Sequence, residues 1–114
     1  MFSKRLKWYY LAENKAELTA WFAYRNTLVH KTLFGEVLLV KEEEGFLAFK
    51  NQCPHQNKSL VDCKVMDGYI ICPFHQYQFS LQNGRGQGLY LDSYPIQFRE
   101  DESVWIGKER WTFL

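Results

Sequence analysis

Apolar and polar positions alternate along much of the chain, in short runs separated by charged or glycine-containing segments. Two such runs, residues 34–41 and 46–50, flank Glu42-Glu43-Glu44-Gly45, where charges and a glycine favour a turn. Alternation with a period of two is the pattern of a half-buried β-strand. These runs therefore predict an antiparallel hairpin whose second strand leads the chain into Cys53.

Similar short runs predict further strands, at residues 7–11, 69–71, 76–80, 94–98 and 103–106. Two dipeptides that end in glycine predict tight turns, namely Asp67-Gly68 and Asn83-Gly84. Residues 12–18 contain helix-forming residues and an asparagine able to cap, so we expect a short helical turn there. The apolar positions of residues 19–32 fit both the helical and the strand period, although Thr27-Leu28-Val29-His30 favours a strand.

The predicted fold class is all-β. A chain of 114 residues can bury one core but is too short for a second catalytic domain, so we expect a single domain over residues 1–114. Its net charge of +1 is not the large positive excess that is typical of proteins that bind nucleic acid. No apolar run approaches the roughly twenty residues of a membrane span, and charges interrupt the N-terminal stretch where a signal peptide would lie. We therefore expect a soluble, cytoplasmic protein.

Two loops each combine one cysteine with one histidine, in Cys53-Pro54-His55 and Cys72-Pro73-Phe74-His75. Sulfur and imidazole donors at this spacing are typical of a transition-metal site. A structural zinc ion accepts two of each, but usually takes both cysteines from one loop and both histidines from the other. In the Rieske arrangement of a two-iron cluster, one iron takes two cysteines and the other takes two histidines. Mixed loops favour this arrangement, with structural zinc as the alternative.

With these motifs the chain resembles Rieske-type [2Fe-2S] ferredoxins and the Rieske domains of ring-hydroxylating oxygenase systems, whose pattern is Cys-x-His followed by Cys-x-x-His. Both motifs match without gaps. The resemblance implies the Rieske iron–sulfur fold: an antiparallel β-sandwich with a cluster-binding subdomain, at about residues 51–83, of two loops at hairpin tips. It also implies one Rieske-type [2Fe-2S] cluster per chain. The ligands that it implies are Cys53, His55, Cys72 and His75.

The resemblance further implies a one-electron carrier, which receives electrons from a ferredoxin reductase and passes them to an oxygenase or similar redox enzyme. No catalytic residue is expected, because no candidate nucleophile or acid–base pair stands beside the loops. The alternatives are a small electron-relay subunit of a larger oxidoreductase complex and a structural zinc-binding domain. No nucleic-acid or membrane partner is expected.

Residues around the loops indicate which branch of the family the chain resembles. Respiratory relatives carry a serine two residues and a tyrosine four residues after the second histidine, and both donate hydrogen bonds to the cluster. Here these positions hold Tyr77 and Phe79, which predicts a potential at the low end of the range of roughly −150 to +300 mV. Respiratory relatives also join the loops by a disulfide, at the positions that Lys58 and Phe74 occupy here.

The remaining candidate residues have structural interpretations. Cys63 is expected to be a small buried or half-buried residue in the segment between the loops, and His30 is expected not to bind metal. Gly84-Arg85-Gly86-Gln87-Gly88 lacks the spacing of a phosphate-binding motif, so its glycines are expected to permit unusual backbone angles or close approach. The edges of the two loop histidines should be exposed, within a rim formed by Gln56, Asn57, Lys58 and Gln76.

Overall fold

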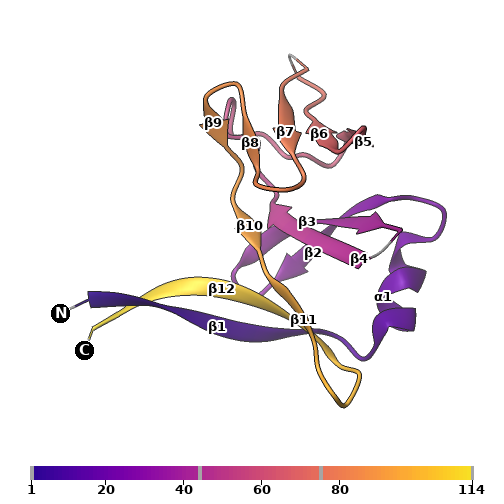
Figure 1. Cartoon of the computed structure of the whole chain (residues 1–114), viewed down its shortest axis with the longest axis vertical. Coiled ribbons are helices and arrows are strands. Elements are labelled where there is room, and N and C mark those ends of the chain that lie inside the picture. Colours follow the sequence, from indigo (N-terminus) through magenta and orange to yellow (C-terminus); the bar gives the residue numbers. More distant parts are fainter. Residues whose placement is uncertain (1, 44, 75, 114) are drawn as a thin grey trace.

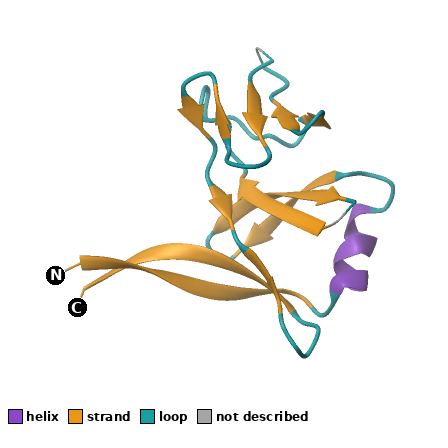
Figure 2. Cartoon of the chain, in the orientation of Figure 1, coloured by secondary structure: helices purple, strands orange, loops and turns teal. Residues whose placement is uncertain are grey.

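The computed structural model describes residues 2–43, 45–74 and 76–113, without the side chains of residues 2 and 111–113. In this part of the chain, antiparallel strands make up most of the fold, and a single helix lies at one edge of it (Figures 1 and 2). The elements are β1 (Phe2–Ala12), α1 (Lys15–Phe22), β2 (Thr27–Thr32), β3 (Gly35–Glu42), β4 (Gly45–Lys50), β5 (Lys64–Met66), β6 (Tyr69–Ile71), β7 (Gln78–Ser80), β8 (Arg85–Gly86), β9 (Leu89–Tyr90), β10 (Ser93–Tyr94), β11 (Ile96–Phe98) and β12 (Val104–Phe113).

The strands form four sheets, and their antiparallel pairing confirms the all-β prediction. One sheet has the order β1-β12-β11, and a second, at the centre of the molecule, has the order β10-β4-β3-β2. Two smaller sheets, β5-β6-β7 and β8-β9, lie together above the central sheet in Figure 1. No helix within the described residues is long and apolar enough to cross a membrane.

Strand β3 divides the hydrophobic interior into two clusters. Its residues Val37-Leu38-Leu39-Val40 are all fully buried, because both faces of the strand are covered. Leu38 and Val40 pack into the cluster that contains the three cysteines. Val37 and Leu39 face the other way, into a cluster with residues of α1 and β12. The predicted hairpin of β3 and β4 is confirmed, and it forms the layer on which the candidate site rests.

The helix is longer than the predicted single turn. Asn14 caps it as expected, since its side-chain oxygen accepts a hydrogen bond of 2.8 Å from the backbone N–H of Glu17. Leu18 and Phe22 lie four residues apart on one face, and both are buried in the second cluster. This burial extends the helix to Phe22, so the ambiguous segment 19–32 begins as helix and ends as the strand β2.

Strands β1 and β12 form a long two-stranded ribbon. The predicted strand at residues 7–11 is part of β1, and the predicted last hairpin is confirmed as β11 and β12. However, β12 continues beyond Ile106 and pairs with β1 from Phe113 opposite Phe2 to Val104 opposite Ala12. Figure 1 shows this ribbon projecting from the rest of the molecule, with both chain ends at its tip. We call it the arm.

Candidate metal centre

The two Cys–His loops differ in how the sheets hold them. The loop with Cys72 connects β6 and β7, which pair antiparallel, so it lies at a hairpin tip as predicted. The loop with Cys53 connects β4 to β5, and these strands belong to different sheets. The prediction of a hairpin tip is therefore wrong for this loop, because β5 pairs forward with β6 and not back with β4.

Despite this difference, the two loops have the same backbone hydrogen bond. The N–H of Cys53 donates to the carbonyl oxygen of Lys58 at 2.8 Å, and the N–H of Cys72 donates to that of Tyr77 at 2.8 Å. Each bond joins a cysteine to the fifth residue after it. This closure turns the chain back on itself and holds each cysteine at the base of a compact loop.

A second feature is shared by the two loops. The fourth residue after each cysteine has a left-handed backbone, with φ of 57° at Asn57 and 58° at Gln76. Such angles are uncommon outside glycine, although asparagine tolerates them better than glutamine. The two loops thus repeat one backbone shape, which places one cysteine of each in an equivalent position.

Asn51 anchors the first loop and was not singled out by the sequence analysis. Its side-chain oxygen accepts a hydrogen bond of 2.8 Å from the N–H of Leu60, and its amide nitrogen donates to Ser59 at 2.9 Å and to Glu36 at 3.2 Å. Asn51 is buried, so these bonds satisfy a polar group that would otherwise be costly. They join the two ends of the loop that contains Cys53.

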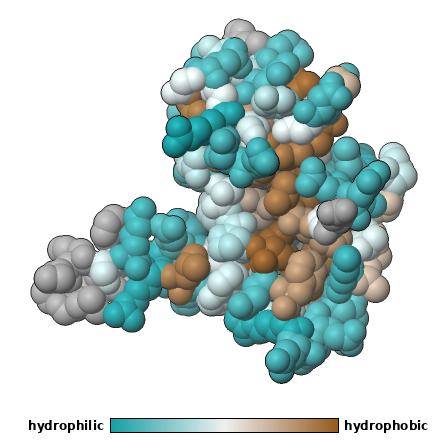
Figure 3. Space-filling view, in the orientation of Figure 1, coloured by the Kyte–Doolittle hydropathy of each residue, from teal (hydrophilic) through white to brown (hydrophobic). Residues whose placement is uncertain are grey.

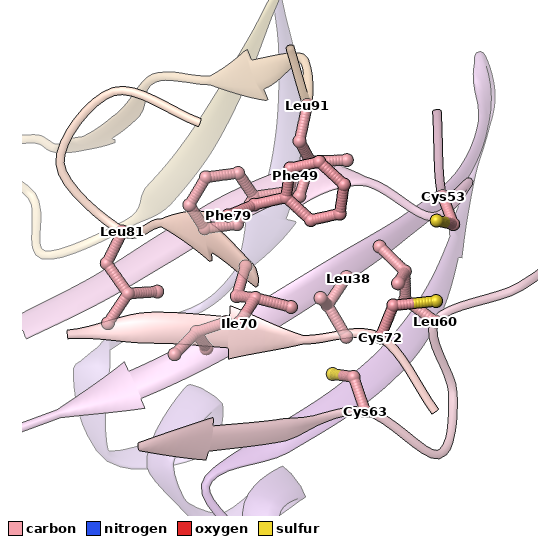
Figure 4. Close-up of a cluster of buried hydrophobic side chains, with 11 residues drawn as sticks. Leu38, Phe49, Cys53, Leu60, Cys63, Ile70, Cys72, Phe79, Leu81 and Leu91 are labelled. Carbon is pink, nitrogen blue, oxygen red and sulfur yellow. The ribbon is translucent and has the colours of Figure 1, made fainter. Parts of the chain in front are cut away.

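The thiols of Cys53 and Cys72 are fully buried and close to each other. Burial raises the pKa of Cys72, the backbone N–H of Phe74 lowers it, and the adjacent Cys53 thiol raises it further. Figure 4 shows both side chains at one end of the hydrophobic cluster, beside Leu60. A metal binds the thiolate, and its positive charge offsets the cost of ionising a buried thiol.

Cys63 completes this group of sulfur atoms. It is buried in the same cluster, as predicted, and Figure 4 shows it near Cys72. Burial, together with the neighbouring Cys72, raises the pKa of Cys63 to about 11. Cys63 is therefore a neutral thiol near neutral pH, packed against the pair but outside the two loops.

The described histidines have different surroundings. His55 is exposed, as predicted, and its ring stacks on Tyr77 with centroids 4.0 Å apart. His75 lies outside the described residues, so its predicted exposure is not addressed. His30 is half-buried in β2 and stacks on Trp21, at 4.7 Å, and burial lowers the pKa of His30. Of the predicted rim, Asn57, Lys58 and Gln76 are exposed and Gln56 is partly exposed.

The described donors of the two loops are the buried thiols of Cys53 and Cys72 and the exposed imidazole of His55. Within residues 2–43, 45–74 and 76–113, no three histidine, cysteine or acidic side chains form a group that could hold one metal ion. A two-iron cluster binds sulfur ligands on one iron and nitrogen ligands on the other, and donors of these two kinds fit that group.

Lys58 and Phe74 connect the two loops. The Lys58 ammonium nitrogen lies 4.5 Å from the centre of the Phe74 ring, which is the geometry of a cation–π contact. Both side chains are exposed. The two positions are those at which respiratory relatives carry the disulfide, so a non-covalent contact joins the loops here.

We expect the Lys58→Met variant to release its cofactor about two to five times faster than the original chain, because a solvent-exposed cation–π contact contributes roughly 0.5–1 kcal/mol. Methionine keeps an apolar stem of similar length but removes the charge. Cofactor release can be followed as loss of visible absorbance in the presence of an iron chelator.

Lys64→Met is the matched control, since Lys64 is another exposed lysine, in β5. Its release rate should equal that of the original chain. Equal rates for Lys58→Met and Lys64→Met would show that the contact does not hold the loops together.

The Cys72 loop at the tip of the β6–β7 hairpin and the Cys53 loop that leads into the same sheet give this chain the site of an iron–sulfur protein. More specifically, it belongs to the Rieske [2Fe-2S] domain family, whose model matches residues 8–92. Its cofactor is a Rieske-type [2Fe-2S] cluster.

The comparisons with individual proteins agree with this family. The ferredoxin component of an alkene monooxygenase system from Xanthobacter autotrophicus is 44% identical over 78 residues, which cover 65% of this chain and 63% of that protein. The chain thus spans less than two thirds of this relative's length. The ferredoxin of carbazole 1,9a-dioxygenase from Nocardioides aromaticivorans has a TM-score of 0.62 at 18% identity, over 71% of this chain and 83% of that one.

A third match is a chain from a complex of reduced oxygenase and oxidised ferredoxin in carbazole 1,9a-dioxygenase. It has a TM-score of 0.68 at 16% identity, over 87% of this chain and 91% of that one. At this level of identity the two solved structures show the shared fold.

Proposed function

We propose that the protein is a one-electron carrier and that Cys53, His55, Cys72 and His75 hold its [2Fe-2S] cluster. The observation that carries the proposal is the repeated loop shape, which brings two buried thiols together and leaves His55 exposed. When bound, the cluster accepts and donates one electron. The chain has a further role in excluding water from the thiols and presenting an imidazole edge at the surface.

The proposed partners are a ferredoxin reductase as the donor and an oxygenase as the acceptor, in the cytoplasm. Support comes from the 44% identity to a ferredoxin component of a monooxygenase system and from the fold shared with a ferredoxin in complex with its oxygenase. Electron exchange would occur at the exposed imidazole edge. The exposed Asn57, Lys58 and Gln76 would surround it as the docking rim.

The potential of the proposed carrier should lie at the low end of the Rieske range. Hydrogen bonds to the cluster raise its potential, because they stabilise the additional negative charge of the reduced form. Phe79 offers no side-chain donor and is fully buried in the hydrophobic cluster, while Tyr77 packs against His55. In a redox titration followed by electron paramagnetic resonance, we expect uptake of one electron per two irons at a midpoint below zero.

Metal analysis of the same sample provides the control. Iron and acid-labile sulfide should be present in equal amounts. Zinc without sulfide would overturn the electron-carrier proposal in favour of a structural metal site. A one-electron midpoint well above zero would leave the carrier in place but contradict the predicted effect of Phe79 and Tyr77.

A further inference from the structure

The arm concentrates the positive charge of the molecule. Its two strands contain five cationic side chains and one carboxylate, which gives the arm a charge of +4. Because the whole chain carries +1, the remaining residues carry −3. In Figure 3 the coloured part of the arm is mostly hydrophilic, in contrast to the apolar patch on the body of the molecule. The small net charge of the chain is therefore the sum of a basic arm and an acidic remainder.

The register of the arm places like charges directly opposite one another. Arg5 is paired with Arg110, and Lys7 is paired with Lys108, two residues further along the ribbon. Directly paired residues of antiparallel strands share a face, so the four cations form one basic face. Like charges in such positions destabilise a sheet. An arm evolved only for stability would not place two such pairs in succession.

No carboxylate in the described side chains neutralises this basic face. The arm's only carboxylate, Glu109, is paired in the register with Leu6 and therefore lies on the opposite face. There it forms an ion pair with Lys4, at 3.1 Å. Of the four cations, Arg5 and Arg110 are exposed, and the Lys7 ammonium lies 5.2 Å from the Tyr9 ring.

The basic face forms one side of a groove of about 550 Å³. From the arm it is lined by three cations, Lys7, Lys108 and Arg110, together with Tyr9 and with Glu109, whose carboxylate is paired with Lys4. Leu33 and Phe34 line it from the turn between β2 and β3. The Leu33 side chain is 93% exposed, which is unusual for a leucine in a chain that buries most of its others. The groove therefore combines cations on one side with an apolar side chain on the other.

We propose that this groove binds an acidic segment of a partner protein, with carboxylates on the basic face and an apolar side chain on Leu33. The ligand supplies the negative charge that the arm lacks, which explains why the repulsive pairs are kept. Phe34 and Tyr9 already pack against each other, at 5.0 Å, so they offer no free faces for stacking nucleic-acid bases.

This binding site does not depend on the electron-carrier proposal. Figure 1 shows the arm on the opposite side of the central sheet from β5, β6 and β7, which hold the second Cys–His loop. A partner could therefore occupy the groove while the loops remain accessible. Failure of one proposal leaves the other unaffected, because peptide binding to the arm is measured without electron transfer.

The test is fluorescence anisotropy of a labelled peptide made of glutamates around a single leucine, titrated with the cluster-loaded protein. Combining Arg5→Gln with Arg110→Gln should weaken binding about fivefold or more, because two exposed charge pairs are lost. Added salt should weaken binding to the original chain in the same direction. The thermal midpoint of the double variant should be equal or higher, since the repulsion between the arginines is relieved.

The matched control combines Arg25→Gln with Arg85→Gln, which removes the same charge from exposed positions outside the arm. Its affinity should change less than twofold. The proposal is overturned if the control weakens binding equally, or if phosphatidylserine vesicles or a single-stranded oligonucleotide bind more tightly than the peptide through the same arginines. Self-association that the arm variant abolishes would likewise assign the face to a second copy of the chain.

Discussion

Replacing His55 with alanine is expected to abolish the visible absorption and the paramagnetic signal of the Rieske cluster. His55 is one of two proposed nitrogen ligands, and an alanine leaves one iron with a single protein ligand. The side chain is exposed and contributes little to the buried core, so the polypeptide should still fold. Circular dichroism, iron content and electron paramagnetic resonance on the same preparation separate loss of the cluster from loss of the fold. The same result is expected for His75→Ala.

His30→Ala is the matched control, because it removes a histidine that is not one of the proposed cluster ligands. His30 is half-buried against Trp21, so its replacement should lower stability more than replacement of His55 while leaving the cluster signals in place. Retention of both signals in His55→Ala would remove His55 from the ligand set. Loss of both signals in His30→Ala, with an intact fold, would contradict the whole assignment.

Local sequence patterns were sufficient to predict the β3–β4 hairpin and the Rieske family of the chain. The β3–β4 hairpin combines two apolar runs with a charged turn, and both Cys–His motifs are contiguous in the sequence. These signals involve residues a few positions apart. The shared closure at Lys58 and Tyr77 was not predicted, because backbone hydrogen bonds to carbonyl groups do not depend on the identity of the side chain.

Features that depend on distant residues were missed or only partly predicted. The pairing of β1 with β12 joins the two ends of the chain, and no turn signal marks it. Between the loops, Leu60, Val61 and Met66 are all apolar, yet Leu60 is fully buried whereas Val61 and Met66 are more than half exposed. Which apolar side chain faces the interior was decided by packing against β3 and by the hydrogen bond that the backbone N–H of Leu60 donates to the side-chain oxygen of Asn51.

The glycine-rich segment after β7 supports the site through close packing. A Cβ atom on Gly86 would overlap the carbonyl oxygen of Gln78 and lie 2.8 Å from its carbonyl carbon and 3.2 Å from the Cα atom of Phe79. All three atoms belong to the backbone of β7, which leads out of the loop with Cys72. The prediction that these glycines permit close approach is therefore confirmed at this position.

We expect Gly86→Ala to lower the free energy of unfolding by about 3 kcal/mol, because only a shift of the backbone of β7 or β8 can accommodate the added methyl group. The shift would also disturb Phe79 and the hydrophobic cluster around the cysteines, so the cluster should be lost faster from the folded protein. Urea denaturation measures the first effect, and chelator-induced bleaching measures the second.

The Gly88→Ala variant measures the effect of backbone conformation on stability separately from the effect of close packing. Gly88 has a φ of 78°, but a methyl group added there would meet no atom within 4 Å, so alanine has only the cost of a left-handed backbone, about 1 kcal/mol. Its bleaching rate should stay near that of the original chain. Equal losses of stability in the two variants would show that the contact between β8 and β7 does not make glycine necessary at position 86. A clearly larger loss of stability in Gly86→Ala would establish that the strands beside the Cys72 loop depend on direct contact between the backbones of β7 and β8.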